Sequence, residues 1–110
     1  MAELAVGQRA TLTRTFAADE VGGVAVPNAL VGGLFSRLLG TELPGRGTNW
    51  MKQSLRFHRR AYAGEALTAT VEIVRLRPEK QLVNLRVICC GGDGSAICDG
   101  EALVMAREMA

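Results

Sequence analysis

Side chains able to move protons are few in this 110-residue chain, and they are not grouped. The single histidine, His58, lies near the end of a strand-like stretch that contains Arg56, and it is followed by Arg59 and Arg60. Imidazole can act as a general base near neutral pH, but no carboxylate stands near His58 in the sequence. We therefore interpret His58 as a surface strand residue rather than a general base. The three arginines are either a solvated strand edge or a landing site for the phosphates of an anionic ligand.

The cysteines do not suggest a metal site. Cys89 and Cys90 are adjacent and Cys98 stands alone, a spacing that suits no tetrahedral ligand set. An odd number of cysteines, in a chain whose N-terminus resembles neither a signal peptide nor a transit peptide, argues against a disulfide framework. We expect no metal, no cofactor and a cytoplasmic location.

Composition indicates one ordinary globular domain over residues 1–110. The chain is 48% hydrophobic and 22% charged, with a formal net charge of +2. Basic residues are scattered without a long run, which gives a nucleic-acid role little support. The longest apolar stretch is shorter than the roughly 20 residues that cross a bilayer, so we expect no membrane partner.

That apolar stretch, Pro27–Gly40 (PNALVGGLFSRLLG), predicts a helix. Asn28 is a suitable N-cap, and Gly40 occupies the position of a left-handed C-cap residue. Apolar residues cover most of its circumference, which is typical of a buried helix. Gly32 and Gly33 lie mid-helix, where glycine is unfavourable, and we expect them to allow close approach to another backbone. The pattern indicates a central helix enclosed by a sheet.

The rest of the chain predicts strands. Alternating apolar and polar residues occupy four stretches: Ala10–Phe16, Met51–Arg59, Glu65–Leu76 and Leu82–Cys90. We interpret Ala17–Gly23 as a short connection, Val24–Val26 as extended chain before Pro27, and Thr41–Asn49 as a loop. One strand before the buried helix and four long antiparallel strands after it, the last of them following Cys90, indicate an α+β fold with a curved sheet around one helix.

The pair Asp93-Gly94 predicts a two-residue hairpin turn. The resulting register pairs Cys89 with Cys98, Val87 with Gly100, Leu85 with Ala102, and Val83 with Val104. Cys89 and Cys98 then face each other as thiols, because directly paired strand cysteines form strained disulfides. The small residues Cys98, Gly100 and Ala102 would give the glycines of the helix a surface to lie against.

Three segments carry a resemblance to a known family: LVGGLFSRLLGTELPGRGTNWMKQSLRF, YAGEALTATVEIVRLRPEKQLVNLRV and GDGSAICDGEALVM. Over Leu30–Met105 the chain resembles the hotdog-fold MaoC-like dehydratases, which include the (R)-specific enoyl-CoA hydratases. The LPGRGTNW loop followed by Gln53 and LRF is the most specific part.

The resemblance implies an acyl-CoA or acyl-carrier thioester bound at a dimer interface, with water added across its 2,3 double bond. In the family an Asp-x-Asn-x-x-His segment activates the water, and N–H groups at the start of the central helix polarise the thioester carbonyl. By family position, Asn28 and Ala29 bind substrate at the helix start. Asn49, Trp50 and Gln53 line or brace the site.

The catalytic segment of the family is missing. Only AADEVGG separates Phe16 from Val24, and Asp-x-Asn-x-x-His occurs nowhere in the chain. The Ala-His-Gly-like stretch at the helix start is replaced by Val26-Pro27-Asn28-Ala29. We expect hydratase activity to be lost or altered.

Two alternatives stay open at this point. A hotdog thioesterase would need an acid on or near the helix, and none occurs from Val21 to Thr41. Asp19 is either a solvated loop acid or a catalytic group that reaches the site from a partner subunit. Asn28 is either an N-cap or a group that orients a carbonyl or a water. The second alternative is a non-catalytic subunit that binds acyl thioesters or supports a homologue.

Exposed sheet edges favour self-association. A curved sheet of this size leaves edge strands with unpaired backbone groups. Edge-to-edge pairing gives a symmetric dimer, so we expect a homodimer or a higher homo-oligomer.

Overall fold

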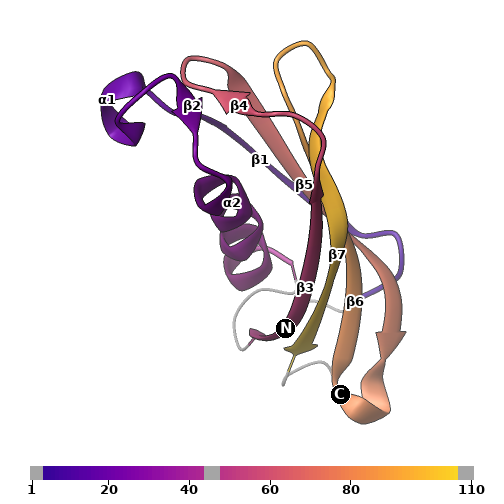
Figure 1. Ribbon diagram of the computed structural model, residues 1–110. Helices are drawn as coiled ribbons and strands as arrows, with labels where there is room; N and C mark the ends of the chain where they lie inside the picture. The colour runs from indigo at the N-terminus through magenta and orange to yellow at the C-terminus, as the bar shows by residue number, and fades with distance from the viewer. Residues whose placement is uncertain (1–3, 44–47, 107–110) are drawn as a thin grey trace.

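The computed structural model describes residues 4–43 and 48–106, and the side chains of residues 48–51 fall outside that description. Its main feature is a curved antiparallel sheet in the order β1-β5-β6-β7-β3, with helix α2 against one face (Figure 1). The elements are β1 (Arg9–Thr15), α1 (Ala18–Val21), β2 (Ala25–Val26), α2 (Asn28–Thr41), β3 (Thr48–Phe57), β4 (Ala61–Tyr62), β5 (Ala66–Arg77), η1 (Pro78–Lys80), β6 (Leu82–Cys90) and β7 (Ala96–Ala106). The α+β fold with one long helix is confirmed.

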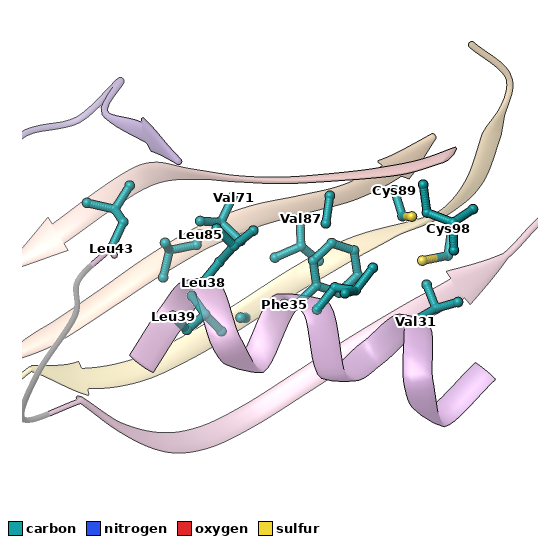
Figure 2. Close-up of a cluster of buried hydrophobic side chains, with 14 of the residues drawn as sticks. Val31, Phe35, Leu38, Leu39, Leu43, Val71, Leu85, Val87, Cys89 and Cys98 are labelled. Carbon is teal, nitrogen blue, oxygen red and sulfur yellow. The ribbon is translucent and has the colours of Figure 1, made fainter. Parts of the chain in front are cut away.

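The core lies between α2 and the sheet. One side of α2 is buried and packs mainly on β5, β1 and β3; its members are Val31, Leu34, Phe35, Leu38 and Leu39. Figure 2 shows Phe35 and Val31 directed from α2 toward the strands that carry Val87, Cys89 and Cys98. These side chains are spaced three and four residues apart, the interval that aligns them on one face of a helix.

The other side of α2 is exposed, so the expectation of a helix buried all round is wrong for the single chain. Gly33, Ser36 and Gly40 are exposed, and Leu30 retains 38% of its accessible surface. The sheet contacts α2 from one side only, so it cannot cover the apolar residues that lie on the opposite side of the helix.

Both predicted helix caps are also wrong. The N-cap is Pro27 (φ −58°, ψ 143°), without a side-chain cap, and Asn28 is the first helical residue. The helix continues through Gly40 to Thr41, and Glu42 caps it in right-handed geometry. The last turn needs no left-handed residue because the Glu42 N–H donates to the Leu38 carbonyl at 2.9 Å and the Thr41 hydroxyl donates to the Arg37 carbonyl at 2.6 Å.

The segment before α2 contains more structure than a connection. α1 forms one helical turn that Gly22 ends in the left-handed conformation (φ 72°), and the Glu20 side chain accepts the Ala17 N–H at 2.9 Å. β2 then pairs with β4 in a separate two-stranded ribbon. After α2, the predicted loop is shorter at both ends, since Thr41 is helical and β3 begins at Thr48; residues 44–47 lie outside the described residues.

The β6–β7 register is confirmed, but the turn is not the predicted one. Val83 pairs with Val104, Leu85 with Ala102, Val87 with Gly100 and Cys89 with Cys98. The Gly94 N–H donates to the Gly91 carbonyl at 3.0 Å, and Gly94 has positive φ. The turn is therefore the longer form that ends in a left-handed glycine. A bulge beside Cys89 and Cys90 restores the register, because Cys90 pairs with Ala96 and leaves Ile97 as the extra residue.

Gly100 allows close approach to a strand, not to the helix as expected. A Cβ there would lie 2.9 Å from the Ser54 carbonyl carbon of β3. On the helix, a Cβ at Gly32 would make ordinary contact with Leu55 at 3.8 Å, and one at Gly33 would meet no atom within 4 Å. The close contact belongs to the β3–β7 pairing.

Candidate functional site

The start of α2 presents backbone donors at the protein surface. The N–H groups of Leu30 and Val31 donate to the Pro27 carbonyl at 3.0 and 3.4 Å. The N–H groups of Asn28 and Ala29 come before these bonds, where a helix offers no intrahelical acceptor. Both residues are exposed. The positive end of the helix dipole adds to the attraction of an oxygen with negative charge.

A cavity of about 300 Å³ opens at this helix start, lined by Ala25, Val26, Pro27, Asn28 and Arg60. β2 supplies the first two residues, and Arg60 immediately precedes β4, which pairs with β2 through Val26 and Ala61. Among the described residues, no carboxylate forms an ion pair with Arg60. The cavity therefore combines a cationic side chain, a side-chain amide and backbone donors without helical acceptors, all of which favour an anionic or strongly polarised oxygen.

Arg60 was identified in the sequence only as one of three clustered arginines, and the structure separates the three. Arg56 lies opposite Asp99 of β7 in the strand register. Arg59 donates to Glu65 and to the Ser95 hydroxyl. Arg60 could have been distinguished from the other two arginines only by the pairing of residues 25–26 with residues 61–62. These segments are far apart in the sequence, so local patterns do not predict their pairing.

Three depressions of about 400–450 Å³ lie between β3, β7 and β6. They run between rows of charged side chains that face away from α2, because Arg56 and Glu101 alternate with the core-facing residues of their strands. Residues of opposite charge are cross-strand neighbours here, since Arg86 lies opposite Glu101 and Arg56 lies opposite Asp99 in the strand register. This is a solvated charged face, and we do not assign the site to it.

His58 belongs to that charged face and not to the cavity. Its Nε2 lies 3.2 Å from Asp99 Oδ2, and the two side chains are 38% and 46% exposed. No carboxylate stands near His58 in the sequence because Asp99 comes from β7, 41 positions along the chain. Phe57, the preceding residue, packs toward the core, so alternation along the strand directs His58 to the opposite face.

The remaining residues expected at the site are dispersed. Asp19 lies in α1, exposed, and does not line the cavity at the start of α2. The backbones of Asn49 and Trp50 pair with Met105 and Val104 of β7, while their side chains are outside the described residues. Gln53 is half-buried on β3, and within the described part of the chain its buried Nε2 has no hydrogen-bond partner.

The cysteines are free thiols with no arrangement for catalysis or metal binding. Cys89 and Cys98 are buried and paired across β6 and β7. Burial raises the pKa of Cys89 to about 11 and that of Cys98 to about 12, so neither is a thiolate at neutral pH. Across residues 4–43 and 48–106, no three His, Cys, Asp or Glu side chains could hold one metal ion.

Among the helices that the structure describes, none has the length and apolar character needed to cross a membrane.

Comparison with known proteins identifies close relatives. No family model matches the chain. An (R)-specific enoyl-CoA hydratase from Aeromonas caviae is 32% identical over 126 residues, which cover 92% of this chain and 94% of the relative. An (R)-specific enoyl-CoA hydratase from Rhodospirillum rubrum is 42% identical over 76 residues, 69% of this chain. That match covers 52% of the Rhodospirillum protein, so the chain spans about half of its length.

The fold agrees with these relatives. The solved structure of an (R)-hydratase from A. caviae involved in PHA biosynthesis superposes with a TM-score of 0.89 at 31% identity, covering 94% of this chain and 98% of that one. The sequence alignment with the Aeromonas protein is longer than the 110 residues of this chain. Part of that relative therefore lies opposite gaps in this chain.

Proposed function

This chain belongs to the MaoC-like, hotdog-fold family of (R)-specific enoyl-CoA hydratases, and from that membership we propose that it binds acyl-CoA thioesters at the start of α2. The thioester carbonyl oxygen accepts hydrogen bonds from the Asn28 and Ala29 N–H groups, which no helical carbonyl uses. Such donors polarise a carbonyl most when they are fixed before the ligand arrives. The cavity beside them has room for the atoms around the thioester.

We propose further that hydration by the usual Asp and His is lost. The observation that carries this proposal is the composition of the cavity: among the described residues, its lining contains no carboxylate and no imidazole. The single histidine of the chain, His58, pairs with Asp99 on the far side of the sheet. Water addition needs one group to remove a proton and another to donate one, and the described lining residues supply neither.

Arg60 and Asn28 give the cavity its ligand preference. The Arg60 guanidinium is a cation and stabilises negative charge on the bound carbonyl oxygen. The Asn28 amide, freed from capping because Pro27 is the N-cap, orients the same oxygen. A thioesterase would need an acid near this oxygen; among the described residues none lines the cavity, so we do not favour that function.

We also propose a homodimer formed through β3. Both β1 and β3 are edge strands of the sheet. β1 is seven residues long, and Arg14 is one of its half-buried residues. Arg14 forms an ion pair with Glu20 of α1 at 2.5 Å. Charged side chains that point inward from an edge strand hinder its pairing with another strand. β3 has ten residues and no such block among its described side chains. An acceptor from a second copy would satisfy Gln53 Nε2.

The three free thiols support the proposal of a reducing, cytoplasmic location.

Crotonyl-CoA tests the catalytic part. Loss of enoyl absorbance measures hydration, free thiol measures thioester cleavage, and a rise in melting temperature measures binding. We expect binding without either reaction. Enoyl loss at a rate comparable to an intact family member would contradict the loss of hydration, and thiol release would favour the thioesterase alternative. A chain that acyl-CoA does not stabilise would contradict the binding proposal.

A further inference from the structure

A network of polar contacts joins the segment before β4 to the β6–β7 turn. The Glu65 carboxylate accepts from both terminal nitrogens of Arg59, with the Nη1 contact at 3.2 Å. It also accepts the Tyr62 N–H at 3.2 Å and the Gly92 N–H at 3.3 Å. Arg59 Nε donates to the Ser95 hydroxyl at 2.9 Å. We call Arg59, Glu65 and Ser95 the clamp.

The clamp is partly shielded from solvent, which separates it from ordinary surface ion pairs. The Arg59 and Glu65 side chains are 28% and 18% exposed, whereas the Arg9–Glu72 pair on the sheet leaves 67% of Arg9 exposed. A two-pronged arginine–carboxylate contact fixes both side chains in direction as well as distance. The Glu65 carboxylate therefore holds the Tyr62 backbone in one place.

Gly91 leaves the space that the contact between Arg59 and Glu65 occupies. A Cβ at Gly91 would lie 3.0 Å from Glu65 Cδ, and closer still to Glu65 Oε1 and Arg59 Nη2. Gly91 has no positive φ, so glycine is needed there for room and not for conformation. The neighbouring Gly92 has no such restriction, because its nearest atoms would be 3.9 Å away.

The clamp acts on the cavity through β4 and β2. Tyr62, held by Glu65, pairs with Ala25, and Ala61 pairs with Val26, the residue before the N-cap of α2. A ribbon with two residues in each strand is not stable alone, so its position depends on what anchors it. Arg60, whose carbonyl accepts from Arg59 at 2.7 Å, lines the cavity directly.

We propose that Arg59 and Glu65 are positioning residues for the cavity at the start of α2: the clamp fixes β4, and β4 in turn fixes Arg60 and the Asn28 and Ala29 N–H groups. The inference rests on the proposed function in that the ligand placed there is an acyl-CoA thioester. Small displacements of positioned groups have large effects on recognition.

Gly91→Ala and Gly92→Ala form a matched pair for the test. The added methyl at Gly91 meets the ends of two flexible side chains and not backbone, so the variant folds but displaces the clamp. We expect Gly91→Ala to weaken crotonyl-CoA binding about tenfold or more and to shift the amide NMR signals of Tyr62, Asn28 and Ala29. Gly92→Ala should change neither.

Glu65→Gln provides the second perturbation, since it removes the charge that holds Arg59 while keeping the size of the side chain. It should reproduce the Gly91→Ala effects. The double variant should bind crotonyl-CoA no more weakly than either single variant, because both substitutions act through one contact. Unmoved Asn28 and Ala29 signals in folded Glu65→Gln would overturn the proposal. If the wild-type chain binds no crotonyl-CoA, the binding proposal fails, while the amide signals still decide whether the clamp positions the helix start.

Discussion

Replacing Gly100 with alanine places a methyl group where the backbone of β3 runs. The new Cβ would lie 2.9 Å from the Ser54 carbonyl carbon and 3.0 Å from Leu55 Cα, and closer still to the Ser54 carbonyl oxygen. These atoms belong to a strand paired with β7 at this position, so they cannot move aside as the end of a side chain would. We expect the free energy of unfolding to fall by about 3 kcal/mol, the upper end of the usual cost of overpacking.

For a domain of this size, that loss lowers the melting temperature by about 12–24 °C. Thermal and urea unfolding at one protein concentration measure it. Gly33→Ala is the control, because its methyl group meets no atom within 4 Å and a helical alanine adds about 0.5–1 kcal/mol of stability. A Gly100→Ala protein within about 0.5 kcal/mol of the wild type would refute the β3–β7 geometry.

The hydrogen bond from Arg59 lowers the pKa of Glu65. The ionised Glu65 carboxylate therefore stabilises the folded state above the unfolded-state pKa, and this stabilisation is lost as the pH falls through the lower folded-state pKa. Glu65→Gln should consequently show a smaller loss of stability than the wild type in acid unfolding titrations. Cys89 and Cys98, with pKa values raised to about 11 and 12 by burial, should resist a thiol reagent at pH 8 in the native protein and react in denaturant; rapid native labelling of either would contradict their burial. His58→Ala should bind crotonyl-CoA as the wild type does by calorimetry, and a lost affinity would place the site on the charged face of the sheet.

Local patterns were enough to predict most of the fold. Strand alternation gave the long strands, and the register of β6 and β7 followed from the position of Asp93-Gly94 although the turn has another form. The predicted strand partners are correct because the bulge at Ile97 compensates for the longer turn. The α2 pattern correctly indicated a core helix, but the number of its apolar residues could not reveal that only one side meets the sheet.

Contacts distant in the sequence were not predictable from local patterns. Asp99 reaches His58 from another strand, and Gly100 approaches Ser54 and not the helix. The clustered arginines read as one feature in the sequence, yet β2–β4 pairing brings Arg60 to the cavity while Arg59 turns to Glu65. Asn28 and Ala29 were expected at the helix start from the family resemblance, and their role there remains a proposal.

Titration of crotonyl-CoA into the isotope-labelled chain, followed by NMR, tests the central claim most directly. One sample reports the amide signals of the protein and the vinyl protons of the ligand together. We predict saturable shifts at Asn28 and Ala29, with the vinyl signals unchanged over the period of the titration. Shifts confined to the charged face around Arg86 and Glu101, or conversion of the vinyl signals to those of a 3-hydroxyacyl product, would contradict it.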